Sequence, residues 1–421
     1  MAPNTEHFNN DELQPPEWLN DEFFLKVLYN CEVTAKANGL QLIQTKISPA
    51  SQKGDHYASI MFRAALDYRL NDVVKSRSLI IKTMPEMEGH KKEMVSESHI
   101  FETEIGMYAE VLPRLERILR EAGDDTVLKA ACLYHSLSPK KVIVFEDIVP
   151  LGYEVIRGRF VNIEELKLAY AKLAKLHATS YKINKEEPHY FDKYCNSMFD
   201  MPNIMEDEMM TSGISNFIDF LNETPALRQY VPYFEPFRKN LLQKCLAGFH
   251  ELRDAPKADG YYAMCHGDFH GKNMMFKHDP VTGKCEDVML LDYQVSYVGP
   301  IVNDLLYSQY LLLDADLRKI YPEILHHYFT VFASTLKKIG FQGEMPKLVR
   351  LRQQLLEHKH YELFLATSVL PMVYAFQDPK TDLNDLMTSN DYRRTLYHAK
   401  VYTDELHELL PKLLHLGYFE D

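Results

Sequence analysis

The chain has 421 residues, 46% of them hydrophobic, enough to bury two substantial cores or one unit of two lobes. The formal net charge of −13 disfavours binding to nucleic acids and to anionic membrane surfaces. The six cysteines form no C-x-x-C pair and the opening residues lack an apolar signal segment, so we expect a cytoplasmic protein. The longest apolar run, residues 363–376, is too short for a membrane span and contains Pro371, which predicts a buried, kinked helix and no membrane anchor.

Up to about residue 150, strand-like segments alternate with one long helical pattern. Runs rich in β-branched and aromatic residues predict strands at 57–66, 78–85 and 140–148. Residues 90–115, which lie between them, have the apolar spacing of a helix. We therefore predict that residues 1–147 form a small, β-rich N-terminal lobe with one long helix.

The rest of the chain is mainly helical in pattern. The predicted helices cover residues 162–182, 233–255, 322–340 and 347–370. One hairpin interrupts them at residues 273–294, with a turn that contains Pro280 and Gly283. Residues 148–421 are thus predicted to form a large helical C-terminal lobe.

The strongest chemical motif is residues 265–276, with the sequence CHGDFHGKNMMF. His266, Asp268 and Asn273 have the H-x-D-x-x-x-x-N spacing of a kinase catalytic loop. In such a loop the aspartate accepts the proton of the attacking hydroxyl, and the asparagine holds Mg²⁺. By itself a His-Gly-Asp turn would more simply be a polar turn that satisfies its own backbone. We assign His266 to the support of the loop.

A second motif favours the kinase interpretation. The apolar strand of VMLLDYQ, residues 288–294, ends at Asp292, 24 residues after Asp268. This is the place where a kinase keeps the aspartate that joins Mg²⁺ to the β- and γ-phosphates. One hairpin accounts for the separation of the two motifs.

Lys82 lies inside the apolar strand at residues 78–85, where a buried cation needs an anionic partner. In a kinase this lysine binds the α- and β-phosphates of ATP and is oriented by a helix glutamate. Glu104 shares a helix face with apolar residues, whereas Glu102 falls on another face, so we predict Glu104 as the partner. The alternative is an exposed edge lysine in a solvated ion pair.

The remaining nucleotide contacts have weaker signals. A hairpin loop predicted to cover the phosphates has a single glycine, and an ordinary β-turn explains it equally well. Its candidate ATP-binding residues are Gly54, Asp55, Tyr57 and Ser59. Residues 142–148, VIVFEDI, would form the adenine hinge, with a backbone carbonyl from Glu146 and an amide from Ile148.

In this order and spacing, the motifs resemble those of the ecdysteroid kinase-like (CHK kinase-like) family, relatives of choline kinases and aminoglycoside phosphotransferases. The resemblance extends over most of the chain and includes GPIVNDLLY at residues 299–307. It implies an α+β, bilobal protein-kinase-like fold, ATP and Mg²⁺ as cofactors, and a small-molecule alcohol as acceptor, with ecdysteroid-type steroids as the best-known class. The sequence departs from the family pattern where LDYQ, with Tyr293, replaces the more usual Asp-Phe-Gln.

The spacing after Asp292 also favours a small-molecule acceptor. Only eleven residues separate Asp292 from Asp304, too few for the activation segment on which a protein kinase binds its peptide. Asp304 is expected to hold the catalytic-loop backbone. The acceptor would then lie against apolar side chains of the C-terminal lobe, although each of these is individually more typical of helix packing. They are Phe199, Met201, Met205, Met209, Met210, Phe217, Phe220, Tyr361, Phe364, Tyr374 and Phe376.

Two other functions remain open. A choline- or aminoglycoside-type kinase would bind a cationic acceptor, for which Glu206, Asp207 and Glu208 offer acidic groups, although such a run is usually a solvated helix face. A catalytically inactive kinase fold would only bind a ligand, and the intact motif residues argue against it. No obligate protein partner is evident from the sequence.

Overall fold

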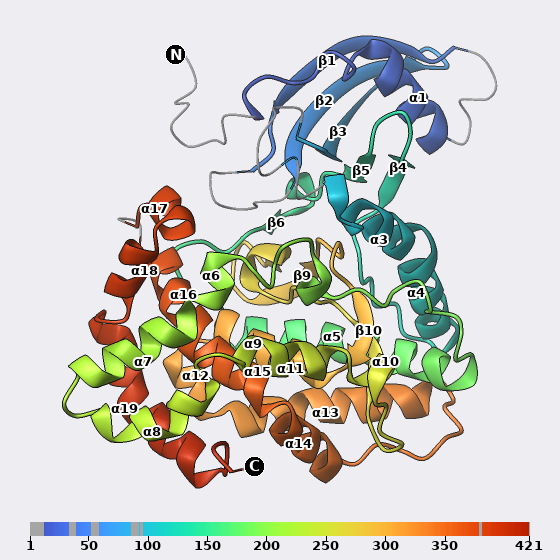
Figure 1. Cartoon of the computed structure of the whole chain (residues 1–421). Helices are drawn as coiled ribbons and strands as arrows, with labels where there is room; N and C mark the ends of the chain where they lie inside the picture. Colours follow the sequence, from blue (N-terminus) through green and yellow to red (C-terminus); the bar gives the residue numbers. More distant parts are fainter. Residues whose placement is uncertain are drawn as a thin grey trace. The chain divides into compact units, whose positions relative to one another are not determined.

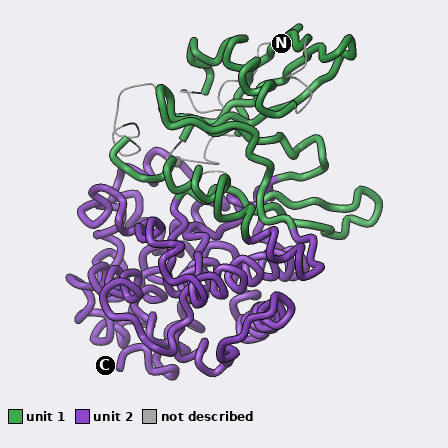
Figure 2. The backbone as a smooth tube through the Cα atoms, turned by 90° about the vertical axis from the view of Figure 1, so that its right-hand side faces the viewer, with its two compact units in different colours: residues 1–114, 127–154, 275–294 green, residues 115–126, 155–274, 295–421 purple. Residues whose placement is uncertain are grey.

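The computed structural model describes residues 12–32, 39–51, 59–85, 92, 96–378 and 381–420 (Figure 1). The chain forms two compact units that interleave along the sequence (Figure 2). Unit 1 contains residues 1–114, 127–154 and 275–294, and unit 2 contains residues 115–126, 155–274 and 295–421. The predicted lobe boundary at residue 147 stays a prediction.

Unit 1 is built on an antiparallel sheet with the strand order β1-β2-β3-β5-β4. The strands are β1 (Gln41–Pro49), β2 (Ile60–Leu70), β3 (Val73–Thr83), β4 (Cys132–Ser136) and β5 (Val142–Glu146). Alternate residues of β2 are buried and pack with helix α1 (Asp21–Cys31) in one apolar core. The predicted strands correspond to β2, β3 and β5, whereas α1, β1 and β4 were not predicted.

The alternation of side chains on β3 determines where its lysine points. Leu79 and Ile81 belong to the core on the α1 side of the sheet. Because successive side chains of a strand face opposite sides, Lys82 points to the other face. The predicted helix at 90–115 is described from Ile100 onwards as α3 (Ile100–Gly106), the π-helical turn η3 (Met107–Val111) and α4 (Leu112–Glu121).

The predicted hairpin is present as β8 (Met274–His278) and β9 (Cys285–Leu290). Together with β6 (Tyr153–Glu154), which follows the short η4 (Val149–Leu151), these strands form a sheet with the order β6-β8-β9. Residues 275–294 therefore belong to unit 1, although the residues on both sides of them belong to unit 2.

Unit 2 is mainly helical, and its long helices α5 (Ile163–Glu186) and α13 (Tyr321–Lys338) pack against each other. A two-stranded sheet of β7 (Tyr262–Cys265) and β10 (Tyr297–Pro300) was not predicted. The other elements are η5 (Met198–Asp200), α6 (Glu208–Thr211), α7 (Gly213–Glu223), η6 (Arg228–Tyr230), α8 (Val231–Phe234), η7 (Glu235–Phe237), α9 (Leu241–Phe249), α10 (Glu251–Asp254), η8 (Gly271–Asn273), α11 (Val302–Leu311), α12 (Ala315–Lys319), α14 (Leu348–Glu357), α15 (Lys359–Phe364), η9 (Leu365–Val369), α16 (Leu370–Gln377), α17 (Leu383–Thr388), α18 (Asn390–Leu396) and α19 (Lys400–His415).

Two of the predicted helices of unit 2 are interrupted. The segment 233–255 is divided into short helices, and Pro236, which has no N–H to donate, lies inside the first turn of η7. The apolar run 363–376 contains the π-helical turn η9, after which Pro371 lies in the first turn of α16. In the part of the chain that the structure describes, no helix combines the length and apolar character needed to cross a membrane.

The N-terminus of α5 generates a stability prediction. The Asn162 side chain accepts hydrogen bonds from the backbone N–H groups of Glu164 and Glu165, and the Glu165 carboxylate accepts one from the Asn162 N–H at 2.8 Å. We expect Asn162→Ala to lower the free energy of unfolding by about 1 kcal/mol, measured by urea denaturation. Asn240→Ala is the matched control, because Asn240 begins α9 without a side-chain capping bond. Equal losses in the two variants would contradict the assigned cap.

Candidate active site

A buried cation lies at the centre of the first cluster, in unit 1. The side chain of Lys82 forms ion pairs with Glu104 Oε2 at 2.6 Å and with Asp292 Oδ1 at 2.7 Å, and its Nζ also donates to Gln294 Oε1 at 3.1 Å. Glu102, the competing carboxylate, pairs with Lys141 at 2.8 Å. The cluster therefore joins β3, α3 and the segment that follows β9.

The charged groups of this cluster shift the pKa of Lys82 and of Glu104. Burial acts to lower the pKa of the Lys82 ammonium, but Asp292 and Glu104 outweigh it and leave the pKa raised. Burial raises the pKa of the Glu104 carboxyl, against the opposing effect of Lys82. With both carboxylates ionised the cluster carries one excess negative charge, which suits it to a second cation.

Asp292 has an unusual backbone conformation, with φ of +62°. Aspartate is among the few residues other than glycine that enter this left-handed region without great cost. The residue lies just after the buried strand β9, and its side chain keeps 19% of its surface exposed. It is thus a carboxylate at a sharp turn, with one oxygen on Lys82.

The residues predicted to contact ATP elsewhere are only partly described. Gly54, Asp55 and Tyr57 lie outside the described residues, and Ser59 is buried just before β2. At the predicted hinge, the Glu146 N–H donates to the Ala131 carbonyl, and the Ile148 carbonyl accepts from Leu151 and Tyr153. The Glu146 carbonyl and the Ile148 amide, the two groups predicted to bind adenine, are not the groups engaged in these hydrogen bonds. Neither role is tested by the geometry.

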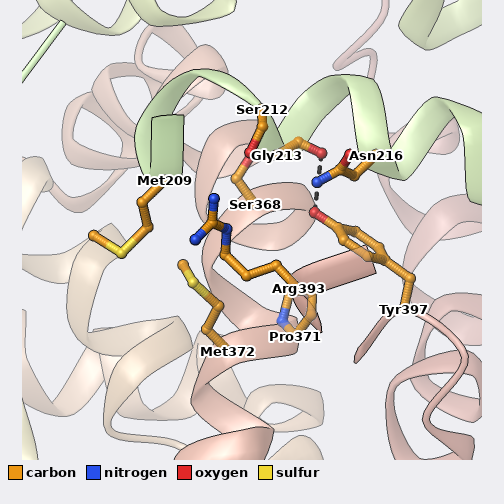
Figure 3. A pocket seen from close by; sticks show the side chains of 9 residues that line it. All are labelled: Met209, Ser212, Gly213, Asn216, Ser368, Pro371, Met372, Arg393 and Tyr397. Carbon is orange, nitrogen blue, oxygen red and sulfur yellow. Dashed lines mark hydrogen bonds between the residues drawn. The ribbon is translucent and has the colours of Figure 1, made fainter. Parts of the chain in front are cut away.

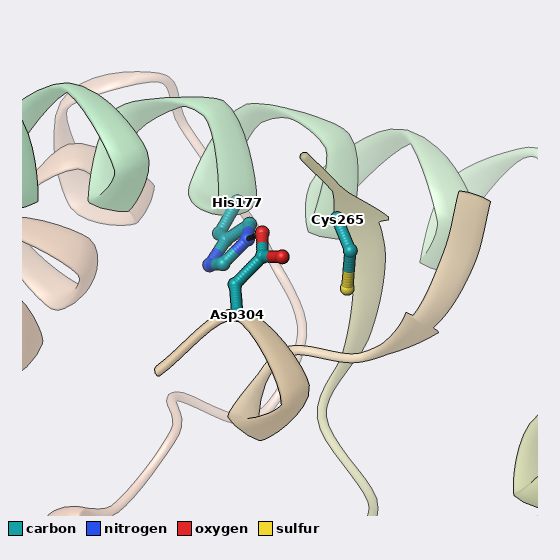
Figure 4. Close-up of side chains that lie close together, drawn as sticks. All are labelled: His177, Cys265 and Asp304. Carbon is teal, nitrogen blue, oxygen red and sulfur yellow. Dashed lines mark hydrogen bonds and ion pairs between the residues drawn. The ribbon is translucent and has the colours of Figure 1, made fainter. Parts of the chain in front are cut away.

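The second cluster, in unit 2, is a loop supported from below by a buried carboxylate. Asp304, in the first turn of α11, accepts hydrogen bonds from the backbone N–H groups of His266 at 2.6 Å and Gly267 at 2.9 Å. His177 of α5 contacts the same carboxylate at 3.1 Å (Figure 4). The His266 carbonyl accepts a further bond from Ser296 at 2.9 Å. The loop backbone is therefore fixed on both sides.

His177, Cys265 and Asp304 lie close enough together to suggest a metal site (Figure 4). However, the other ring nitrogen of His177 is hydrogen-bonded to Tyr328 at 2.6 Å, and both oxygens of Asp304 already accept hydrogen bonds. Burial raises the pKa of the Cys265 thiol well above its usual value, which opposes the thiolate that a metal needs. The group is best explained as structural support for the loop.

Asp268 lies on this loop and is surrounded by hydrogen-bond donors. Its Oδ1 accepts from the Tyr307 hydroxyl at 2.6 Å and lies 3.2 Å from His270 Nε2, and its Oδ2 accepts from Asn273 at 2.8 Å. Burial acts to raise the pKa of Asp268, but His270, Tyr307 and His266 outweigh it, so the pKa lies well below its usual range. The group is consequently an oriented carboxylate anion at neutral pH.

The donor set of these residues fits Mg²⁺, which prefers oxygen ligands. The amide nitrogen of Asn273 faces Asp268 at 2.8 Å, so its carbonyl oxygen, the atom that would bind a metal, points away from that carboxylate. Asp292 uses Oδ1 for Lys82, which leaves Oδ2 as its candidate ligand atom. Both residues thus offer an oxygen of the required kind.

Several residues of the two clusters were missed by the sequence analysis. They are His177, His270, Gln294 and Tyr307. Tyr307 lies three residues after Asp304 on α11, a spacing that places both on one helix face. His270 lies inside the quoted motif, two residues after Asp268. The contacts themselves depend on tertiary structure and have no local signal.

Gly267 generates a second stability prediction. Its φ is +84°, and a Cβ added there would lie 2.2 Å from the Val295 carbonyl oxygen. We expect Gly267→Ala to lower the free energy of unfolding by more than the roughly 1–2 kcal/mol cost of the left-handed conformation alone. Gly283→Ala is the control, because Gly283 has φ of +68° with nothing within 4 Å of the added atom. Similar thermal unfolding of the two variants would show that the clash is relieved.

The chain was compared with solved structures, with curated proteins and with models of protein families. The solved structures that are similar to the chain include three small-molecule kinases or phosphotransferases. A Plasmodium vivax ethanolamine kinase has 12% identity, coverage of 92% of this chain and 91% of that one, and a TM-score of 0.38. A microcompartment-associated aminopropanol kinase has 10% identity, coverage of 95% of this chain and 99% of that one, and a TM-score of 0.38. The GDP complex of aminoglycoside 2'-phosphotransferase-IIIa has 10% identity, coverage of 93% of this chain and 100% of that one, and a TM-score of 0.41.

At such low TM-scores the assignment depends on the family comparison. No curated protein matches the sequence. The model of the ecdysteroid kinase-like family matches residues 53–341, which confirms the resemblance and the α+β kinase-like fold predicted from the sequence. The chain belongs to the ecdysteroid kinase-like family.

Proposed function

We propose that the protein is a cytoplasmic kinase that transfers the γ-phosphate of ATP, with Mg²⁺ as cofactor, to a hydroxyl group of a small molecule. Membership of the ecdysteroid kinase-like family supports a small-molecule phosphotransferase in general. The observation that carries the specific proposal is the buried Lys82, held by Glu104 and Asp292 at 2.6 and 2.7 Å. A buried ammonium flanked by two carboxylates is the arrangement that protein kinases use for the phosphates and metal of a nucleotide.

In this proposal the residues of unit 1 bind the nucleotide. Lys82 contacts the α- and β-phosphates while Glu104 fixes its orientation. Asp292 and Asn273 are the proposed oxygen ligands of Mg²⁺, as their places in the two sequence motifs predict. When bound, the ion neutralises charge on the phosphate oxygens. The Glu146 carbonyl and Ile148 amide bind adenine, and Gly54, Asp55, Tyr57 and Ser59 cover the phosphates.

Asp268 is the proposed base. It accepts the proton of the acceptor hydroxyl as that oxygen bonds to the γ-phosphorus, the bond from the γ-phosphorus to the bridging oxygen breaks, and ADP leaves. Tyr307 and His270 contact Asp268 Oδ1 at 2.6 and 3.2 Å and are positioning residues. The low pKa of Asp268 keeps it ionised at neutral pH, so the carboxylate carries no proton of its own.

We propose that the acceptor is at least partly apolar, such as a steroid-like alcohol, because some apolar side chains of unit 2 are partly exposed. Among the apolar residues considered from the sequence, Phe199, Phe217, Phe220, Tyr361 and Phe364 are buried and pack on other rings. Met209 and Phe376 are partly exposed, and Lys272, next to Asn273, lies 4.8 Å from the centre of the Phe376 ring. These side chains, rather than the buried aromatics, are the candidates for acceptor contact.

The observed contacts give less support to a cationic acceptor. Asp207 caps α6 by accepting from the Met209 N–H at 2.8 Å, and Glu208 pairs with Arg393 at 2.9 Å. Two of the three acidic residues that the sequence offered for a cation therefore have partners within the protein.

The first test is phosphate transfer itself. With Mg²⁺ and γ-labelled ATP, we expect label on a member of a panel of sterols and other apolar alcohols, and none on casein. Asp268→Asn should reduce turnover by roughly 10²-fold or more while ATP affinity is nearly unchanged, because only the proton acceptor is lost. Label appearing only on choline, ethanolamine or aminoglycosides, or on casein, would reject the proposed acceptor class. Turnover near that of the wild type in the variant would remove Asp268 from its role.

The second test concerns the metal. Asp292→Ala should abolish the Mg²⁺-dependent part of ATP binding in calorimetry, because the ion loses a ligand and Lys82 loses a partner. Glu286→Ala removes the same charge from an exposed position on β9 and should bind Mg·ATP like the wild type. Unchanged Mg·ATP affinity in Asp292→Ala would contradict the assignment.

A further inference from the structure

A small pocket in unit 2 shares only Met209 with the residues given roles above (Figure 3). Its walls come from α6, the start of α7, the η9–α16 segment and α18, which are distant in sequence. The lining residues are Met209, Ser212, Gly213, Asn216, Ser368, Pro371, Met372, Arg393 and Tyr397. We call it the Arg393 pocket.

Two polar atoms in this lining are buried without a partner. Neither Arg393 Nε nor Ser212 Oγ has a hydrogen-bond partner among the residues that the structure describes. Arg393 is only 4% exposed, yet the rest of its guanidinium is bonded, to Glu208 at 2.9 Å and to the carbonyls of Leu386 and Met387 at 3.3 Å. Buried donors are nearly always satisfied in proteins, so these two point to an occupant.

The pocket is narrow because its back wall is closely packed. A Cβ added to Gly213 would lie 2.4 Å from the Ser368 side chain, so α7 and η9 approach each other closely there. The Tyr397 hydroxyl closes the same region by donating to the Gly213 carbonyl at 2.9 Å. The free volume is about 10 Å³, which admits one water-sized group and no more.

The mouth of the pocket is apolar in character. Met209 and Met372 are partly exposed, and their thioether chains lie beside the Arg393 guanidinium (Figure 3). Methionine side chains are flexible and adapt to the shape of apolar ligands. A group held by Arg393 and Ser212 would therefore extend outward between two apolar side chains.

We propose that the Arg393 pocket binds the oxygen of a carboxylate or carbonyl group at one end of an otherwise apolar small molecule. The guanidinium Nε–H is a donor and cannot accept, and a serine hydroxyl can donate beside it, so both match an acceptor oxygen. A carboxylate forms the stronger bond because the contact is assisted by charge. The compensating Glu208 is 65% exposed, which weakens its hold on Arg393.

One wall of the pocket belongs to helix α16, which also carries a residue that lies against the loop with Asp268. Phe376 lies one turn after Met372 on α16, and Lys272 of the loop lies 4.8 Å from the centre of the Phe376 ring. A ligand anchored in the Arg393 pocket would run past Met372 towards this loop. The identification of this ligand with the phosphate acceptor rests on the proposed function. Its binding in the Arg393 pocket does not depend on that function.

The test is calorimetry without nucleotide, with octanoate, 2-octanone and octylamine as probes. Octanoate and 2-octanone should bind, octanoate more tightly, and octylamine should not, because its head group cannot accept a hydrogen bond from Arg393. Arg393→Gln should weaken octanoate binding by about tenfold or more, and Ser212→Ala by a few-fold. Arg394→Gln is the matched control, since Arg394 is 46% exposed, pairs with Asp219 at 3.7 Å and does not line the pocket.

The proposal is overturned if neither octanoate nor 2-octanone binds the wild-type protein, or if octylamine binds equally well. It is also overturned if octanoate binds Arg393→Gln and Ser212→Ala with unchanged affinity, which would mean that the pocket holds only water. Should Arg393→Gln unfold, Ser212→Ala decides by the same criterion. If the probes bind as expected while no alcohol is phosphorylated, the proposed function fails and the binding site stands.

Discussion

The burial of one ammonium group organises unit 1. An unpaired cation inside a protein is so unfavourable that Lys82 requires carboxylates wherever the sheet places it. Glu104 reaches it from a helix that follows β3, whereas Asp292 comes from 210 positions further along the chain. This ion pair gives a physical reason why residues 275–294 leave the helical unit to pack with the sheet. The chain thus returns to unit 1 at the segment whose Asp292 neutralises the Lys82 ammonium.

Unit 2 has a corresponding centre in Asp304. Its carboxylate binds two successive backbone N–H groups of the loop and the ring of His177, so one buried anion links α11, α5 and the end of β7. Three residues later on the same helix, Tyr307 holds Asp268. One helix therefore fixes both the backbone of the loop and the orientation of its acidic side chain, and in the proposed reaction this preorganisation would serve the proton transfer.

The sequence allowed the family, the fold class and the strands β2, β3 and β5 to be predicted, because apolar, β-branched runs and ordered motifs are local signals. Strand β1 was missed since none of its residues is fully buried and its alternation is weak, and β7 because its four residues are too few to show a period. The helix predicted at 233–255 was wrong as a continuous element, since Pro236 was not weighed against the apolar spacing. The preference for Glu104 over Glu102 came from helix periodicity alone. Tyr307, by contrast, meets Asp268 across 39 residues, a contact that no local pattern encodes.

The left-handed backbone at Asp292 has a consequence for how this position can vary. Residues that tolerate a φ of +62° are few, chiefly glycine, asparagine and aspartate, and of these only aspartate carries a negative charge. Glutamate would keep the charge at the expense of backbone fit, and asparagine or glycine would keep the fit without the charge. Aspartate therefore satisfies both requirements at this position, the steric one of the backbone and the electrostatic one of the negative charge. None of these other amino acids meets both demands, so each such substitution at this position loses either the charge or the backbone fit.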